Sequence, residues 1–322
     1  MVNLEKMRAY VFPVVIGLVG ACSAASNGTG TGGEGGKTGA TSGSGMGGNT
    51  ATSSGSGMGG DGTLFEDGGL TGSGGGGGGS SDCSEEAKLV YIIGQDNKFY
   101  SFYPPTLDVK QIGTISCPNA GFATPFSMAV DRKGVAWILF SDGRIFHVDV
   151  KTAACSATSY APGQNGFSTF GMGFVSNSVG SEDETLYVAD YNGTGLAKID
   201  TAALALSVVG PWDKLTGAAE LTGTGDSRLF GFFNGFPIII AEIDKTNGHI
   251  LTQAPQPTIN IGSGWAFAFW GGDFWLFTSP TGQTQIDRYR PSDGTTTTVK
   301  TGLGTNIVGA GVSTCAPFET PK

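Results

Sequence analysis

The sequence predicts an all-β fold, a five-bladed β-propeller over residues 83–322 that closes by pairing strands from its two ends. From Lys88 onward the chain reads as short runs of β-branched and aromatic residues separated by Gly, Asp, Asn and Pro, a pattern typical of strands and turns. Three strand types then recur five times each, at spacings of 43–51 residues. Repeats of this length are typical of propeller blades.

The three strand types differ in composition. One carries an aromatic residue inside an apolar run, at Tyr91, Trp137, Tyr187, Phe230 and Trp275. A second follows 11–14 residues later and is centred on Phe102, Val148, Ile199, Ile243 and Tyr289. A third precedes the aromatic type and is centred on Ala129, Gly173, Thr222, Ala268 and Gly311. These centres are small, which suits the innermost strand of a propeller because the blades crowd around its axis.

The order of the repeats predicts how the ring closes. The aromatic strand at Tyr91 has no small-residue strand before it, and the small-residue strand at Gly311 has no aromatic strand after it. Pairing these two strands completes the fifth blade and leaves no open sheet edge.

The cysteines indicate an oxidising compartment. Cys22 belongs to the export signal described below, which leaves an even number in the folded part: Cys83, Cys117, Cys155 and Cys315. Four cysteines allow three pairings. Cys83 and Cys315 flank the predicted closure, so we expect a disulfide between them and a second one between Cys117 and Cys155.

The N-terminus has the features of an export signal. Lys6 and Arg8 precede an apolar run over residues 9–19, which is too short to span a bilayer as a helix. The run ends in Leu18-Val19-Gly20-Ala21-Cys22, which resembles the lipobox of bacterial lipoproteins. The resemblance implies a signal peptide over residues 1–21 and lipid attachment at Cys22, so that a lipid anchor holds the protein in a membrane. Ser23 favours the outer membrane; an ordinary secretory signal is the alternative.

Residues 22–82 are composed mostly of Gly, Ser and Thr. Such a segment has too few apolar side chains to offset the conformational entropy lost on folding, so we expect a disordered tether. A chain of this length and composition has a root-mean-square span of about 45 Å. The sequence therefore predicts a folded domain held at a distance from the membrane.

Charge and motifs exclude several classes of function. The net charge is −9 and no basic stripe occurs in the folded part, so nucleic acid is not an expected partner. Neither a nucleophile elbow nor a Gly-rich phosphate loop that opens a helix occurs. The two histidines and the absence of a Cys-x-x-Cys pair give no support for a structural zinc site. We therefore predict no cofactor, no metal and no catalytic residue.

One blade resembles a known group of propellers. The segment Asp131-Arg-Lys-Gly134-Val-Ala-Trp137, followed by Ser141-Asp-Gly-Arg144, is similar to repeats of the NHL, SMP-30 and streptogramin-lyase-like families. With its lipobox and Gly-rich segment, the chain also looks like uncharacterised myxobacterial surface lipoproteins. The lyases use histidines with a metal on one propeller face, and neither His147 nor His249 stands where that pattern puts them. The resemblance therefore implies the fold and not the lyase reaction.

The loops that lead into the innermost strands gather at one mouth of the central channel, and loops on rigid scaffolds commonly carry function. They offer a mixture of aromatic, amide and carboxylate groups: Asn119, Phe122, Gln164, Asn165, Phe167, Trp212, Asp213 and Trp265. This mixture suits a carbohydrate or peptide ligand. We expect a non-enzymatic binding or scaffolding module with a carbohydrate or protein ligand. The alternatives are an exported hydrolase or lyase, with two or more carboxylates or histidines at the mouth, and a purely structural role.

Overall fold

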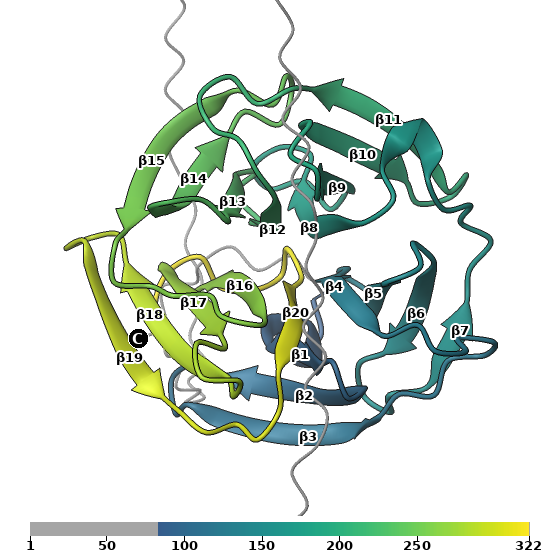
Figure 1. The fold of residues 1–322 in the computed structure, drawn as a ribbon, viewed down its shortest axis with the longest axis horizontal. Helices are drawn as coiled ribbons and strands as arrows, with labels where there is room; N and C mark the ends of the chain where they lie inside the picture. The colour runs from purple at the N-terminus through teal and green to yellow at the C-terminus, as the bar shows by residue number, and fades with distance from the viewer. Residues whose placement is uncertain (1–82, 322) are drawn as a thin grey trace, which may run out of the picture. The chain divides into compact units, whose positions relative to one another are not determined.

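The computed structural model describes residues 83–321. The expectations for the signal peptide, Cys22 and the tether lie outside these residues. The described chain is a ring of five four-stranded antiparallel sheets, which confirms the predicted five-bladed propeller (Figure 1).

The four strands of each blade are given below in order from the central channel to the outside of the ring. Blade 1 combines the two chain ends and contains β20 (Ile307–Val312), β1 (Val90–Gly94), β2 (Lys98–Tyr103) and β3 (Asp108–Thr114). Blade 2 contains β4 (Pro125–Val130), β5 (Val135–Phe140), β6 (Ile145–Asp149) and β7 (Cys155–Ala157). Blade 3 contains β8 (Phe170–Ser176), β9 (Glu184–Asp190), β10 (Leu196–Asp200) and β11 (Ala205–Gly210).

Blade 4 contains β12 (Ala219–Gly223), β13 (Leu229–Phe233), β14 (Ile238–Ile243) and β15 (Ile250–Gln256). Blade 5 contains β16 (Trp265–Trp270), β17 (Asp273–Thr278), β18 (Gln285–Arg290) and β19 (Thr295–Lys300). Two short 3-10 helices, η1 (Glu86–Lys88) and η2 (Gln164–Gly166), lie outside the blades. Each predicted small-residue strand is innermost, and each aromatic strand is second.

The core lies between the blades, because alternate side chains of a strand point to opposite faces of its sheet. In β1, Tyr91 and Ile93 pack against blade 2, whereas Val90 and Ile92 pack against blade 5. All four side chains are buried. Each interface between neighbouring blades has its own hydrophobic cluster of this kind. The near-continuous burial of the second strands follows from having a blade on each side.

Small residues allow the innermost strands to approach one another. A Cβ at Gly171 of β8 would overlap the carbonyl oxygen of Ala219 in β12, and a Cβ at Gly173 would stand 3.1 Å from the carbonyl carbon of Leu221. The small-residue pattern is therefore a packing requirement of the ring.

The ring closes as the sequence predicts. β20 pairs with β1 in antiparallel register, from Val90 opposite Val312 to Gly94 opposite Ile307. A disulfide joins Cys83 to Cys315, with Cα atoms 5.7 Å apart. The second predicted disulfide is also present and joins Cys117 to Cys155, ahead of β4 and at the start of β7, with Cα atoms 5.0 Å apart.

Candidate functional site

The antiparallel strands place two sets of connections at the same end of the channel. These are the loops that enter the innermost strands and the turns between the second and third strands of each blade. We call this end the mouth. In four blades the first residue of the turn donates a backbone hydrogen bond to the residue just before the innermost strand. The pairs are Gln95 to Asn306, Ser141 to Thr124, Tyr191 to Thr169 and Asn234 to Ala218, at 2.8–3.0 Å.

Blade 5 departs from this pattern. Here the amide of Ser279 donates to the carbonyl of Ile261 at 2.8 Å, and the amide of Ser263 donates to the carbonyl of Ser279 at 3.1 Å. The loop before β16 therefore follows a different path, and Ser263, Gly264 and Trp265 line a cavity at the mouth.

This mouth cavity has a volume of about 230 Å³. Two aromatic side chains, Phe126 and Trp265, form part of its wall. Hydroxyl and amide groups stand around them on Gln95, Thr124, Ser141 and Ser263. The lining comes from blades 1, 2, 4 and 5, so only the closed ring assembles the cavity.

Glu220 contributes the one ionisable side chain among the described residues that line the cavity. It belongs to β12, is 4% exposed, and its Oε2 accepts a hydrogen bond of 2.7 Å from Ser127 Oγ of β4. Burial raises the pKa of this carboxyl well above its usual range, and the Ser127 hydrogen bond opposes that shift only in part. Burial therefore favours the neutral, protonated form of this carboxyl.

Glu220 was not among the residues predicted from the sequence, although the sequence contains a signal for it. The five innermost strands are otherwise free of charged residues. A single carboxyl in a strand that faces neighbouring blades on both sides is unusual, because burying an unpaired charge is costly.

Of the eight ligand-binding residues predicted from the sequence, Trp265 lines the cavity. Its ring packs edge-on to Phe232, with centroids 5.7 Å apart. Phe122 is fully exposed in the loop before β4. Asn119 lies in the same loop, where its carbonyl oxygen accepts a 2.8 Å hydrogen bond from Arg144 Nη1. Neither of these two lines the cavity.

The other predicted residues serve the packing of their own loops. Gln164 Oε1 accepts a hydrogen bond from the Leu206 amide, and Gln164 Nε2 donates one to the Leu204 carbonyl. Asn165 Nδ2 donates to the Leu206 carbonyl at 2.7 Å. These contacts tie η2 to β11, the outermost strand of blade 3. Phe167 is buried between blades 2 and 3.

Trp212 and Asp213 are also committed to structure. Trp212 packs edge-on to Phe233 between blades 3 and 4, with centroids 5.2 Å apart, and its Nε1 is buried without a partner in the described chain. Asp213 Oδ1 accepts a 2.8 Å hydrogen bond from the amide of Ile250 at the start of β15. Of the eight predicted residues the cavity thus includes Trp265, and ligand contact by the other seven stays a prediction.

His147, the histidine beside Asp149 in the sequence, has no catalytic arrangement. Its ring packs at a tilt against Trp137 of the neighbouring strand, with ring centroids 4.1 Å apart, and its Nε2 is buried without a hydrogen-bond partner among residues 83–321. Burial lowers the pKa of His147. Asp149 instead accepts hydrogen bonds from Lys151 and Thr152 in the turn after β6. Asp149 therefore does not orient the imidazole.

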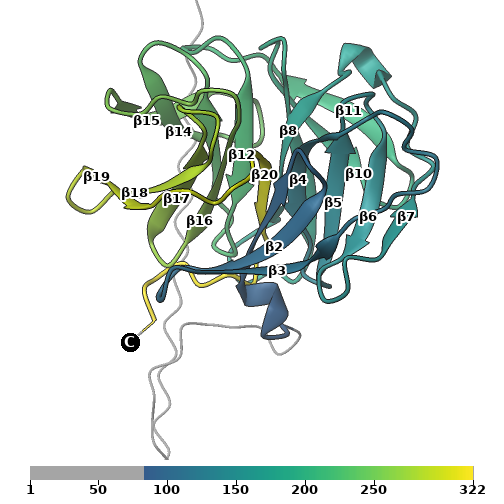
Figure 2. The same ribbon diagram turned by 60° about the horizontal axis from the view of Figure 1, so that its bottom comes forward.

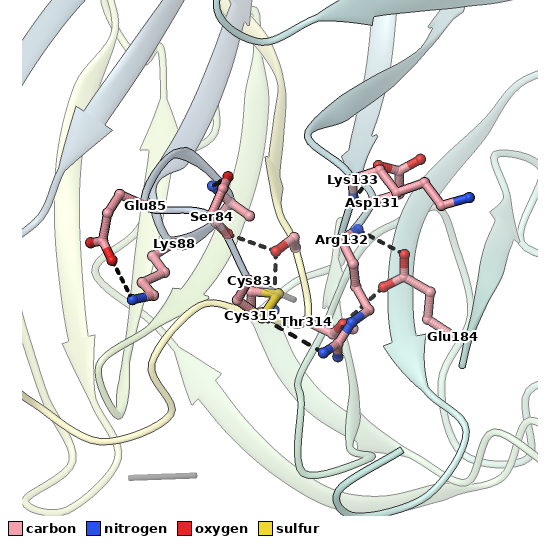
Figure 3. The surroundings of a disulfide bond; sticks show 12 residues. Cys83, Ser84, Glu85, Lys88, Asp131, Arg132, Lys133, Glu184, Thr314 and Cys315 are labelled. Atoms are coloured by element: carbon pink, nitrogen blue, oxygen red, sulfur yellow. Dashed lines mark hydrogen bonds and ion pairs between the residues drawn. A yellow bond between two sulfur atoms is a disulfide. The ribbon is translucent and has the colours of Figure 1, made fainter. Parts of the chain in front are cut away.

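The opposite end of the channel, which we call the closure end, contains a polar network beside the Cys83–Cys315 disulfide (Figure 3). Glu184 accepts hydrogen bonds of 2.8 Å from the Arg132 amide and from Thr314 Oγ1. The Arg132 guanidinium donates in turn to Thr314 Oγ1 at 3.1 Å and reaches Cys83 Sγ at 3.6 Å. These groups come from blades 1, 2 and 3, so the network ties three blades together.

A larger hollow of about 380 Å³ lies between blades 4 and 5. Its charged groups are already paired, because Arg228 makes a two-pronged salt bridge of 2.9 Å to Glu242 and covers the ring of Phe230. The mouth cavity differs in that its carboxyl group has no cationic partner within residues 83–321. We therefore regard the mouth cavity as the candidate binding site.

Within the described residues, no three His, Cys, Asp or Glu side chains lie close enough to hold a metal ion. No helix in that same part of the chain is both long and apolar enough to cross a bilayer.

No family model and no curated protein matches the chain. Among solved structures it is similar to a nidogen/laminin complex at 11% identity, with a TM-score of 0.46 over 69% of this chain and 97% of that one. A Bacteroides thetaiotaomicron protein of unknown function matches at 11% identity and TM-score 0.41, over 66% and 55% of the two chains. Kuenenia stuttgartiensis hydrazine synthase matches at 12% identity and TM-score 0.37, over 68% and 64%. Similarity at this level says nothing about ligand or activity.

Proposed function

We propose that this protein is a cell-envelope lipoprotein, anchored through Cys22, whose propeller is a non-enzymatic module that binds a carbohydrate at the mouth cavity. The observation that carries the proposal is the composition of that cavity. Trp265 and Phe126 supply aromatic surface, and side chains of four different loops and turns supply hydroxyl and amide groups beside it. Sugars are bound by this combination, because their C–H faces pack on aromatic rings while their hydroxyls need hydrogen bonds.

Further aromatic residues on the mouth end support the proposal. Phe122 and Phe236 are fully exposed, in the loop before β4 and in the turn between β13 and β14. Tyr191 is 43% exposed and packs on Phe126 with centroids 5.1 Å apart. A cavity of about 230 Å³ suits one sugar-sized group, and these rings extend the apolar surface beyond it. Exposed aromatic side chains of this kind commonly mark binding surfaces.

The disulfides support an oxidising location such as the periplasm or the cell exterior. Replacing Cys22 by Ser tests the anchor, because the variant is expected to leave the membrane fraction and appear in the soluble fraction. Unchanged membrane association of that variant would contradict the lipobox interpretation.

An exported hydrolase or lyase is the alternative, and it requires a second ionisable group beside the first. Among the described residues that line the cavity, Glu220 has the one carboxyl group, and no histidine accompanies it. Paired carboxylates are what most glycoside hydrolases use. The arrangement therefore favours binding over hydrolysis.

The test is a glycan array probed with the full-length protein, beside Trp265→Ala and Leu251→Ala variants. Trp265→Ala removes one of the two aromatic side chains of the cavity wall and is expected to abolish glycan binding. Leu251→Ala is the control, because Leu251 is an exposed apolar residue of β15, the outermost strand of blade 4, and does not line the cavity. A glycan bound equally by all three proteins would contradict the proposed site, as would a wild-type protein that binds no glycan.

A further inference from the structure

The mouth cavity contains a carboxyl group without a cationic partner among the described residues. Glu220 is the one ionisable residue among the described residues of its lining, and neither Lys nor Arg accompanies it there. Two other carboxylates show the contrast, because Glu242 is paired with Arg228 and Asp142 with Arg144. Glu220 has a hydroxyl instead, that of Ser127.

The geometry of Glu220 leaves one carboxyl oxygen for another partner. Oε2 accepts the Ser127 hydrogen bond, and Oε1 makes no hydrogen bond to any residue in the range 83–321. A buried carboxylate is costly unless a cation pairs with it, so an ionised Glu220 needs a positive charge that the described chain does not place in the cavity. Backbone packing holds the residue in place, because Gly171 lies so close that a Cβ on it would stand 2.6 Å from Glu220 Cα.

The aromatic lining also suits a positive charge. Trp265 and Phe126 stand in the same cavity as the carboxyl group. The faces of aromatic rings attract cations, Trp most strongly, and this attraction grows when the cation is removed from water. A carboxyl group and aromatic rings around a small cavity are therefore complementary to an organic ammonium group.

We infer that the group entering the mouth cavity is the protonated amine of an amino sugar, which forms an ion pair with Glu220 beside Trp265. This inference rests on the proposed carbohydrate-binding function and specifies its ligand. The amino sugar is favoured over a lysine side chain because Gln95, Thr124 and Ser141 offer hydrogen bonds that ring hydroxyls use and an aliphatic stem does not.

Binding is accompanied by the loss of one proton. Burial raises the pKa of Glu220 and so favours its protonated form before the ligand enters. When the ammonium group enters, the O–H bond of the acid breaks, the proton goes to solvent, and the carboxylate pairs with the ammonium. Affinity therefore rises with pH by up to about tenfold per pH unit while both Glu220 in the empty site and the amine remain protonated.

The strands packed against β12 supply no second titratable group to the cavity. β4, β8, β13, β16 and β20 contain none. β9 contains Glu184, Tyr187 and Asp190. Glu184 belongs to the network at the closure end, Tyr187 is buried between blades 3 and 4, and Asp190 accepts hydrogen bonds from Thr194 in its own turn. The pH dependence is thus assigned to Glu220.

Isothermal titration of the full-length protein tests the inference. The probes are a glucosamine tetramer, its neutral N-acetylglucosamine counterpart, and trilysine, each at pH 5.5 and 6.5. We expect the glucosamine tetramer to bind about tenfold or more tightly than the neutral tetramer and than trilysine at pH 6.5, as a charged hydrogen bond in a buried site allows. We also expect its affinity to be higher at pH 6.5 than at pH 5.5.

Glu220→Gln keeps the size of the side chain and its bond to Ser127, and it removes the charge. We expect it to lose the preference for the amine and the pH dependence, with an unchanged melting temperature or a higher one. Equal binding of the charged and neutral tetramers by the wild-type protein, or tighter binding of trilysine, would overturn the inference. So would full retention of the preference by Glu220→Gln. If the inference fails in one of these ways, a neutral glycan whose binding depends on Trp265 would leave the proposed function standing. The absence of any glycan, charged or neutral, whose binding depends on Trp265 would end both.

Discussion

The closure of the ring leads to a quantitative prediction about its two disulfides. The Cys83–Cys315 bond spans 232 residues of sequence, whereas the Cys117–Cys155 bond spans 38. Removing a crosslink mainly frees the unfolded chain, and the loss grows with the logarithm of the loop length. The chain-entropy relation gives about 5.5 kcal/mol for the longer loop and about 3.9 kcal/mol for the shorter one. We therefore expect Cys83→Ala/Cys315→Ala to be less stable than Cys117→Ala/Cys155→Ala by about 1.6 kcal/mol.

Urea denaturation of the full-length protein, followed by tryptophan fluorescence, measures this difference. All five tryptophans lie in the propeller, so the signal reports the propeller. The β1–β20 register and the hydrogen bond from Ser313 Oγ to the Ala87 carbonyl keep the ring closed in the folded variant. The variants then differ chiefly in the freedom of the unfolded chain. A variant without the longer crosslink that is as stable as the one without the shorter crosslink would refute this reasoning.

Two further predictions concern charge burial and backbone packing. Burial raises the pKa of Glu184 from its usual value of 4.5 to about 7, so the folded protein holds this proton more tightly than the unfolded chain does. Protonated Glu184 therefore adds to the free energy of unfolding at low pH, and this contribution is lost as the pH rises from 4.5 to 7. Urea titrations at pH 5 and pH 8 should show a decrease of at most about 3 kcal/mol in the wild-type protein that Glu184→Gln lacks. Gly171→Ala should destabilise by about 1–3 kcal/mol or more, because its Cβ overlaps the Ala219 carbonyl. The control Gly235→Ala, whose Cβ would stand 3.4 Å from the Pro237 carbonyl oxygen, should change stability by about 0.5 kcal/mol or less. Equal melting temperatures for these two variants would contradict the packing argument.

The ring was predictable from the sequence because each blade repeats the same physical requirements. A small centre such as Gly173 fits the crowded axis, and an aromatic such as Tyr187 fills the space between blades. The unpaired strands at the two chain ends then specify the closure, and the positions of Cys83 and Cys315 follow from it. The spacing of the strands and their order depend only on positions along the chain, so both can be predicted directly from the sequence.

The cavity was less predictable because it depends on side chains from different blades. Trp212 precedes an innermost strand and Trp265 begins one. Trp212 nevertheless packs in the core against Phe233, whereas Trp265 lines the mouth cavity. The difference arises from the path of the loop before β16, where Ser279 bonds to Ile261 instead of the residue next to the strand. No local sequence pattern specifies this change of hydrogen-bond partner. Glu220 could have been found, since it is a charged residue in a strand type that is otherwise uncharged.

The two ends of the channel differ in a way that bears on which one receives a ligand. At the closure end, Arg132, Thr314 and Glu184 satisfy one another, and the disulfide lies beside them. η1 and the segment after β20 also lie at this end (Figure 2). At the mouth, by contrast, the Glu220 carboxyl has an oxygen without a hydrogen bond from residues 83–321 and no cation from those residues beside it. The chain enters the propeller at Cys83, at the closure end. The closure end is therefore occupied by paired polar groups and by the start of the propeller, whereas a ligand can supply a missing interaction at the mouth.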